Sequence, residues 1–401
     1  MNQKQQNSTP KKSQQNNSIS QTLSENENSN ETQKEQTLKP KETINTLFPE
    51  ENFPEGKTIQ YVLTKTEEKR SSNDIDLEQK ETQFFEEKLK NLRKAAEVHR
   101  QVRKFANTLI KPGSKLLDIC DQVEDYARFF IEEDGLKAGL AFPFGCSINN
   151  IAAHYTSNPG DETILEESDV LKIDFGTHVN GYIIDSAYTI AFNPKYDTLL
   201  NASKEATYSA IKLSGIDSRL LEIGDEIEEI ITSYEIELDN KVYPLTPIFN
   251  LCGHSLDQYL IHSGTSILPC NYGPNLKMEE GKMYAIETFA STGKGFAKKK
   301  GECSHYMLKP NAKKFLVTRK SSKAFLQFLE NEFGTLAFCN RWLKRLGRNE
   351  TKKDLKRLSR SGVLGKFPPL GDIKGSYVSQ HEHTIILRSK CTEILSWGED
   401  Y

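Results

Sequence analysis

The segment 170–190 contains two β-prone runs on either side of Asn180 and Gly181. An Asn-Gly pair between such runs is the strongest short-range signal for a type I′ β-hairpin. If this pair is the centre of the turn, Asp174 and Asp185 lie diagonally on the same face of the hairpin. The flanking positions are largely apolar on both faces, which argues against a solvent-facing strand with two unrelated acids. Two carboxylates are therefore predicted to converge on one face.

The spacing of these two aspartates suits a pair of metal ions. Diagonal neighbours have Cβ atoms roughly 7 Å apart, which fits two ions about 3.5–4 Å apart, one bound by Asp174 and both bridged by Asp185. Glu287 and Glu382 each lie in an apolar, strand-like run, where an unpaired charge would cost several kcal/mol. Four carboxylates balance the charge of two divalent cations, so the cluster is neutral only when both ions are present.

Histidine is scarce, with eight residues in the chain, and three of them lie in Gly- or Ala-rich loops of the same half: His154, His254 and His262. An oxygen-rich site with a single imidazole favours Mn, Fe(II) or Co over the metals that prefer thiolates. Two-metal sites of this kind activate water for attack on a carbonyl group. The predicted chemistry is therefore hydrolysis.

The first 50 residues have a different composition from the rest, because 28 of them are Asn, Gln, Ser or Thr. Such a segment cannot bury enough apolar surface to offset its ordering entropy. We predict a disordered tail over 1–46, an extended polar lead-in over 47–78 and a folded domain over 79–401. The net charge of the whole chain is −3, which gives no global attraction to DNA or to anionic membranes.

The cysteines and the apolar segments point to a cytoplasmic protein. The seven cysteines are an odd, scattered set without a C-x-x-C pair, which argues against a disulfide framework or a thiolate zinc site. No stretch approaches the roughly 20 apolar residues that span a bilayer, and the N-terminus lacks the apolar core of a secretory signal. Reduced thiols in the cytoplasm and no membrane association are expected.

Helical periodicity brackets the candidate site. Amphipathic patterns cover 79–108 and 117–133, strand and loop patterns cover 139–310, and a helical insert covers about 309–370. Within the insert, residues 341–360 carry nine Lys or Arg and two acids. A solvated helix face is the favoured interpretation, and contact with ribosomal RNA is the alternative.

The order Asp, Asp eleven residues later, His, Glu, Glu resembles that of the methionine aminopeptidase and prolidase superfamily, whose fold is the α+β pita-bread fold. Within it, the chain is most similar to eukaryotic type 2 methionine aminopeptidases, over about residues 47–401. The helical insert between Glu287 and Glu382 corresponds to the helical subdomain that type 1 enzymes lack. The similarity is carried by the segments 139–147, 152–156, 172–178, 192–200, 285–289 and 334–339.

The resemblance implies roles for individual residues. The implied metal ligands are Asp174, Asp185, His254, Glu287 and Glu382. The implied catalytic residues are His154, His262 and Glu287, with the last moving a proton from the attacking water to the leaving amine. The implied substrate-binding residues are Phe142, His154, Ile261, His262, His305, Ala337 and Phe367.

The same resemblance implies removal of the initiator methionine from nascent proteins with a small second residue, by a monomer that uses two divalent ions (Co, Mn, Fe(II) or Zn). Two alternatives are an Xaa-Pro peptidase of the superfamily and a non-catalytic pita-bread protein that binds ribosomes or RNA. The chain departs from the family at His381, where an aromatic residue usually precedes the bridging glutamate. Its tail also lacks the alternating basic and acidic blocks that accompany initiation-factor binding in animal enzymes.

Overall fold

The computed structural model describes residues 42–61, 72–349 and 351–400, with the side chains of its first long helix described from residue 83 onward. The described residues belong to one compact unit, and the fold described below is that of this unit. Most of the predicted tail lies outside the described residues. No helix in the described part of the chain is long and apolar enough to cross a membrane.

The folded region begins before the boundary that the sequence predicts. Helix α1 (Ile44–Leu47) crosses the predicted boundary, because its first three residues belong to the predicted tail and Leu47 follows it. Ile44 and Leu47 are buried in the main core, and α1 contacts α3. The mean composition of the tail hides this pair of apolar residues at helical spacing, so the boundary at 46 is too late.

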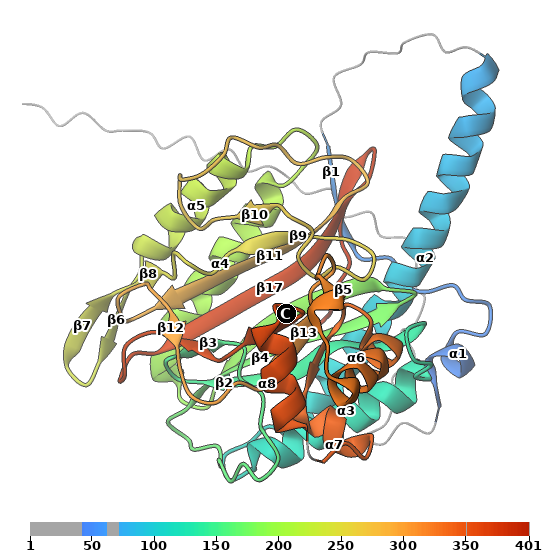
Figure 1. Ribbon diagram of the computed structural model, residues 1–401. Helices are drawn as coiled ribbons and strands as arrows, with labels where there is room; N and C mark the ends of the chain where they lie inside the picture. Colours follow the sequence, from blue (N-terminus) through green and yellow to red (C-terminus); the bar gives the residue numbers. More distant parts are fainter. Residues whose placement is uncertain (1–41, 62–71, 350, 401) are drawn as a thin grey trace, which may run out of the picture. The chain divides into compact units, whose positions relative to one another are not determined.

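Two antiparallel sheets carry the predicted metal ligands (Figure 1). The hairpin strands belong to a three-stranded sheet, ordered β2 (Ala138–Ile148), β4 (Val170–Val179) and β5 (Tyr182–Ala191). The larger sheet is ordered β1 (Lys57–Gln60), β18 (Cys391–Ile394), β17 (Val378–Leu387), β11 (Met283–Ser291), β9 (Gly253–Leu256) and β10 (Ser266–Ile267), and β8 (Thr246–Pro247) also pairs with β11.

Four helices cover these sheets. Helices α2 (Ser72–Leu109) and α3 (Leu116–Ile131) pack on the sheet of β2, β4 and β5, as the amphipathic patterns predict. Helix α4 (Asp197–Leu213) packs on β11 and β17, and α5 (Leu220–Thr232) contacts β8 and β10. Strands β5 and β17 contact each other, so the two sheets meet between the two layers of helices.

The segment predicted as an extended lead-in contains regular structure. Strand β1 pairs antiparallel with β18, and α2 begins at Ser72 rather than at residue 79. The pairing of β1 was not predicted because its partner lies more than 300 residues away in the sequence. Shorter elements complete the main body: η1 (Pro194–Tyr196), β3 (Ile151–Ala153), β6 (Glu235–Leu238), β7 (Lys241–Pro244), β12 (Lys298–Lys299) and β16 (Leu370–Gly371).

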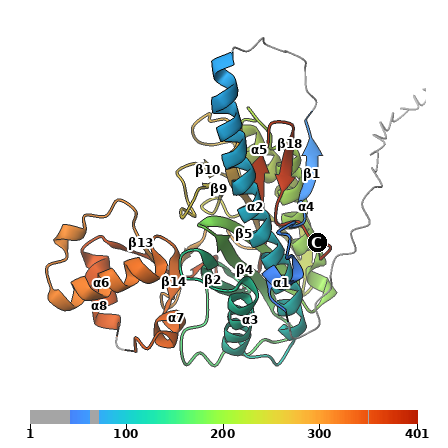
Figure 2. The same ribbon diagram turned by 90° about the vertical axis from the view of Figure 1, so that its right-hand side faces the viewer.

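The insert adds a small sheet and three helices beside the main sheets (Figure 2). It contains β13 (His305–Leu308), η2 (Lys314–Leu316), α6 (Lys320–Phe333), β14 (Ala337–Cys339), α7 (Asn340–Arg345), α8 (Lys352–Arg360) and β15 (Leu364–Phe367). Because β13 is the central strand of this sheet, the insert begins at His305 rather than near 309. Its apolar side chains belong to the same core cluster as those of α3.

The basic run of the insert is only partly a solvated face. Lys352, Lys353, Lys356 and Arg360 of α8 are exposed, as the favoured interpretation predicts. Arg341 of α7, in contrast, is buried and forms an ion pair with a glutamate of α3. The periodicity of one segment does not reveal a partner that a distant helix provides.

Candidate metal centre and substrate cavity

The predicted hairpin is confirmed with its predicted register. Asn180 and Gly181 form the turn with φ values of 51° and 79°, the two positive values that a type I′ turn requires. Asp174 faces Ala187 and Asp185 faces Gly176 across the β4–β5 pair. The two aspartates therefore lie diagonally on one face.

The larger sheet brings three more predicted residues to this point. Glu287 of β11 lies directly opposite Glu382 of β17, and His254 of β9 lies opposite Ala285 of β11. The Thr384 side chain accepts a hydrogen bond from the Asp185 N–H at 2.8 Å and donates one to the Asp185 carbonyl at 2.6 Å. These bonds align the edge of the hairpin with β17, so carboxylates from both sheets face one another.

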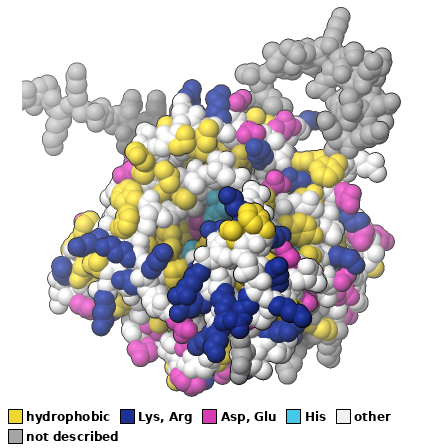
Figure 3. Space-filling view, in the orientation of Figure 1, with side chains coloured by type: hydrophobic (Ala, Val, Ile, Leu, Met, Phe, Trp, Pro, Cys, Tyr) yellow, Lys and Arg dark blue, Asp and Glu magenta, His cyan; other side chains and the backbone are white. Residues whose placement is uncertain are grey.

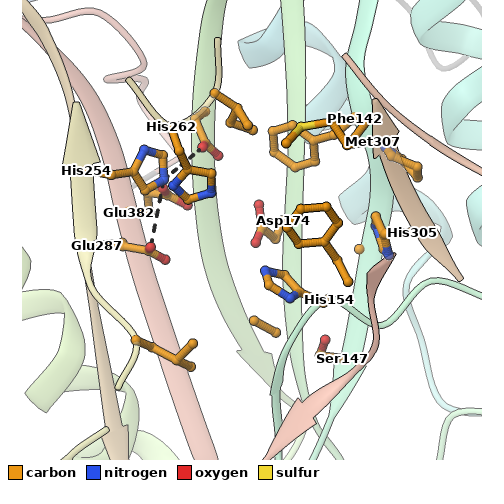
Figure 4. Close-up of a pocket in the computed structure, with 18 of the residues that line it drawn as sticks. Phe142, Ser147, His154, Asp174, His254, His262, Glu287, His305, Met307 and Glu382 are labelled. Atoms are coloured by element: carbon orange, nitrogen blue, oxygen red, sulfur yellow. Dashed lines mark ion pairs between the residues drawn. The ribbon is translucent and has the colours of Figure 1, made fainter. Parts of the chain in front are cut away.

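The ligand atoms lie close enough to share metal ions (Figure 4). The Nε2 atom of His254 lies 3.7 Å from Asp185 Oδ2 and 4.0 Å from Glu287 Oε1. Ligand atoms of Asp185, His254 and Glu382 all lie within 4.8 Å of one another. A divalent ion placed among them would contact an imidazole and several carboxylate oxygens, which suits Mn, Fe(II), Co or Zn.

Burial makes this cluster unfavourable unless positive charge is supplied. Burial raises the pKa of Asp174 to about 6. Burial and then the charges of Asp174 and Glu287 raise the pKa of Asp185 well above its usual range, and the pKa of Glu382 is raised by burial and its acidic neighbours. Asp174 Oδ1 is buried without a hydrogen-bond partner. The cluster therefore fits divalent cations, which would neutralise the carboxylates and occupy that oxygen.

Gln380 is a neighbour of the cluster that the sequence analysis missed. Its Nε2 donates hydrogen bonds to Asp174 Oδ2 and to Glu287 Oε2, both at 3.2 Å. It lies on β17 two residues before Glu382, so the two-residue period of a strand places both on the same face. That period was the available signal, and Gln380 now orients two of the predicted ligands.

One cavity collects every residue that the sequence analysis assigned to the site. Sequence reasoning did not include seven other residues that line it: Pro143, Gly145, Ser147, Ala153, Leu251, Phe289 and Met307. In Figure 4 His254, Glu287 and Glu382 lie on one side of the cavity, Phe142, Met307 and His305 lie on the other, and Asp174 lies between them. The cavity thus has two sides. Its acidic side, called here the carboxylate side, consists of Asp174, Asp185, His254, Glu287 and Glu382. Its apolar side is formed mainly by His305, Met307, Ala337 and Phe367 of the insert and is called here the insert wall.

The insert wall is built by strand pairing. Phe367 of β15 and Cys339 of β14 flank His305 of β13, and Ala337 faces Met307 in the same small sheet. Met307 lies two residues after His305, so strand periodicity could have identified it. This wall combines apolar groups with one thioether and one imidazole. A wall of this composition suits contact with a short, unbranched apolar side chain.

Besides His254, three histidines line the cavity: His154, His262 and His305. The ring of His262 is 4.0 Å from that of His254, and the ring of His154 meets Phe367 edge-on at 5.9 Å. Burial, with a contribution from His262, lowers the pKa of His154 to about 4, and burial also lowers the pKa of His262 and brings that of His305 to about 3. Near neutral pH these rings are uncharged, so each has one N–H to donate and one nitrogen to accept.

His381, the residue that departs from the family pattern, is not part of the cavity. Its ring packs edge-on against Tyr208 of α4 at 5.4 Å, on the opposite face of β17 from Glu382. Burial lowers the pKa of His381 to about 3, so it is neutral. It therefore adds neither a ligand nor a charge on the carboxylate side.

The chain is similar to known metallopeptidases. The sequence profile of metallopeptidase family M24 matches residues 90–312. A methionine aminopeptidase 2A of Arabidopsis thaliana is 46% identical over 372 residues, which cover 92% of this chain and 82% of the relative. A methionine aminopeptidase 2 of Schizosaccharomyces pombe is 45% identical over 372 residues, which cover 92% of this chain and 85% of the relative.

Solved structures support the same fold. A thermophilic Arx1 matches with a TM-score of 0.65 and 20% identity, covering 77% of this chain and 90% of that one. A methionine aminopeptidase of Rickettsia prowazekii matches with a TM-score of 0.51 and 17% identity, covering 78% of this chain and 98% of that one. The predicted α+β pita-bread fold is thereby confirmed. With these similarities and the carboxylate cluster described above, the chain belongs to metallopeptidase family M24, among the methionine aminopeptidase 2 relatives.

Proposed function

We propose that this protein removes the initiator methionine from nascent proteins whose second residue is small. The observation that carries the proposal is the cavity itself, in which carboxylates and an imidazole face an apolar wall across a short gap. A peptide N-terminus at the carboxylate side would direct its first side chain toward the insert wall. The names of the relatives, methionine aminopeptidase 2A and methionine aminopeptidase 2, agree with this substrate.

The carboxylate side would hold two divalent ions, which supply a Lewis acid and lower the pKa of water. Asp174 would bind one ion, His254 and Glu287 the other, and Asp185 and Glu382 both. Gln380 would keep one oxygen of Asp174 and one of Glu287 in place by its two hydrogen bonds, leaving their other oxygens for the metals. The ion in the cell would be Mn, Fe(II), Co or Zn.

The protein's own side chains would handle the substrate and the protons. His154 and His262 are both neutral. His262 would donate an N–H group to the peptide carbonyl oxygen as negative charge develops there, and His154 would bind the scissile peptide nitrogen. Glu287 would accept a proton from the attacking water and return it to the leaving amine. Phe142, Ile261, His305, Ala337 and Phe367 would enclose the methionine side chain.

The insert supports a proposal about the partner and the compartment. Residues 309–370 carry 16 Lys or Arg and four Asp or Glu, although the whole chain is slightly acidic. In Figure 3 basic side chains gather below the central hollow, where α8 lies in Figure 1. This distribution suits ribosomal RNA near the point where nascent chains emerge, and thus a cytoplasmic monomer that meets its substrates there.

Peptide hydrolysis tests the enzymatic part. The metal-loaded protein should cleave Met-Ala-Ser and its norleucine analogue, should cleave Val-Ala-Ser poorly, and should bind about two ions per chain. Hydrolysis of Xaa-Pro dipeptides instead of Met-Ala-Ser would favour the prolidase alternative. Absence of metal binding and of all peptidase activity would favour the non-catalytic alternative.

Cosedimentation with purified ribosomes tests the partner. Binding should weaken steeply between about 50 and 200 mM salt, because phosphate contacts release counterions. Lys352→Glu with Lys356→Glu should reduce binding, whereas Lys212→Glu, on the exposed side of α4, should not. Equal binding by all three proteins would contradict a role for α8.

A further inference from the structure

The side chain of Arg341, on α7, is bonded to several segments of the chain although it lies outside the cavity. It is 6% exposed. Its Nη1 donates to Thr156 Oγ1 at 2.7 Å and to the Ser157 carbonyl at 2.6 Å, and its Nε donates to Asp121 Oδ1 at 3.1 Å. Its Nη2 forms an ion pair with Glu124 of α3. The guanidinium thus connects three separate segments of the chain.

Glu124 extends these connections to a fourth segment. Its Oε1 accepts the backbone N–H of Phe144 of β2 at 3.0 Å, and its Oε2 accepts the Trp342 indole N–H at 2.7 Å. Only 2% of Glu124 is exposed. The two charged groups therefore form a polar junction among α3, β2, the chain after β3 and α7.

Three of these four segments, all but α3, adjoin residues that line the cavity. Phe144 directly follows Pro143 and Phe142 on β2, and Thr156 lies two residues after His154. Arg341 lies four residues after Ala337, just beyond the end of β14. Neither Arg341 nor Glu124 lines the cavity, but their bonds join the segments that carry its lining residues.

The backbone at His154 makes such support necessary. His154 has a φ of 64°, in the left-handed region that residues with a Cβ rarely adopt. A conformation of this kind persists only when the surrounding structure holds it. The bonds from Arg341 to Thr156 and Ser157 begin two residues later and provide that restraint.

A buried ion pair of this kind is not needed for stability alone, because well-packed apolar residues often serve equally well in its place. Resting on the proposed function, we propose that Arg341, together with Glu124, is a positioning residue for methionine cleavage. It holds His154 at a fixed distance from the insert wall that contains Ala337. Substrate placement and the preference for methionine both depend on that distance.

Two variants test the proposal in the metal-loaded, full-length protein. Arg341→Lys keeps the charge beside Glu124 but loses the planar fork that reaches Thr156, Ser157 and Asp121 together. Arg341→Met combined with Glu124→Gln removes both charges, so neither is left buried and unpaired. Both should lower kcat/KM for Met-Ala-Ser by about 10- to 100-fold, since misplacement of about 1 Å can cost that much. The preference for Met over Leu should fall, and metal affinity measured by calorimetry should not change.

The matched control is a second, partly buried ion pair whose residues do not line the cavity. Arg93 of α2 bonds Glu393 of β18 through two hydrogen bonds of 2.9 Å. Arg93→Met with Glu393→Gln should alter the melting temperature but leave KM and the Met-to-Leu preference at their original values. A loss of discrimination in this control would mean that general destabilisation explains the Arg341 results.

The outcomes separate the two proposals. If the unmodified protein does not cleave Met-Ala-Ser, the proposed function is wrong and the positioning role falls with it. If it does, and Arg341→Lys has the original KM and Met-to-Leu preference, only the positioning role is wrong. Should the double variant fail to fold, Arg341→Lys alone decides, and a loss of metal binding in that variant would also contradict the proposal.

Discussion

The two sides of the cavity are built in different ways. On the carboxylate side, the predicted metal ligands come from long neighbouring strands, and their spacing follows from register: Asp174 and Asp185 across one hairpin, Glu287 and Glu382 across another pair. On the insert wall, short strands carry apolar side chains, and long-range polar bonds such as that of Arg341 hold the wall against the main body. The comparison suggests that sheet register determines the chemistry and that an insertion determines which side chain is accepted.

The largest effect is expected when a proposed metal ligand is removed from the carboxylate side. Asp185→Asn should lower kcat by at least about 1000-fold, because a neutral amide oxygen cannot share negative charge between two cations. Metal analysis should find fewer than two ions per chain, with the fold retained by circular dichroism. The control Asp134→Asn, an exposed residue paired with Lys137, should keep both ions and full activity. Normal turnover with two ions in Asp185→Asn would refute the assignment of the carboxylate side.

The next largest effect is expected from a substitution in the insert wall that leaves the proposed metal ligands intact. Ala337→Leu should overfill the space opposite Met307 and raise KM for Met-Ala-Ser by about 10- to 100-fold, the equivalent of 1–3 kcal/mol. Metal stoichiometry should stay at the original value, because no ligand changes. Ala337→Gly, which adds no volume, is the matched control and should keep KM within a few-fold. A loss of metal in Ala337→Leu would show that the two sides are not independent.

Local patterns predicted the carboxylate side better than the insert wall. The Asn180-Gly181 turn gives the register of β4 and β5 directly, and hence the positions of two ligands. That Glu287 and Glu382 face each other could not be predicted in this way, since almost 100 residues separate the two strands. The residues of the insert wall came from resemblance, because no local period links β13, β14 and β15.

The residues that were missed have physical explanations. Met307 and Gln380 each lie two residues from a predicted residue on the same strand face, so a strict use of strand periodicity would have included them. Arg341 could not be recognised, because the burial of a cation depends on Glu124, 217 residues earlier in the sequence. Ile44 was concealed by the polar average of its surroundings, although it is fully buried.

A smaller effect concerns the metal-free protein and its pH dependence. Burial, followed by the charges of Asp174 and Glu287, raises the pKa of Asp185 well above its usual range. Below the ordinary aspartate pKa of about 3.9, the side chain is protonated in both states and has no effect on stability. As pH rises above that value, ionisation in the unfolded chain increasingly favours unfolding. Asparagine does not ionise, so metal-free Asp185→Asn should melt higher than the original protein.

Thermal melting in a chelating buffer measures this difference. The advantage of Asp185→Asn should grow from pH 5 to pH 8 by a few degrees, since one kcal/mol shifts the melting temperature of a moderate-sized domain by about 2–4 °C. Added divalent metal should stabilise the original protein more than the variant and reverse the order. A difference that does not vary with pH would mean that Asp185 is not held in a desolvated, acidic cluster. That result would not bear on the insert wall.

The smallest expected effect comes from removing residues 1–41. Both sides of the cavity are built from residues that follow this segment, and its composition provides almost no large apolar groups for a core. The truncated protein should therefore keep kcat/KM for Met-Ala-Ser and its melting temperature within experimental error.

A second truncation, through residue 47, is the contrast. It also removes Ile44 and Leu47, which are 0% and 6% exposed, and should lower the melting temperature by several degrees. Its kcat/KM at low temperature should stay unchanged, because α1 packs against α3 and neither helix lines the cavity. If the shorter truncation already reduced activity, the region before residue 42 would contribute to the cavity, and the division into a carboxylate side and an insert wall would be incomplete.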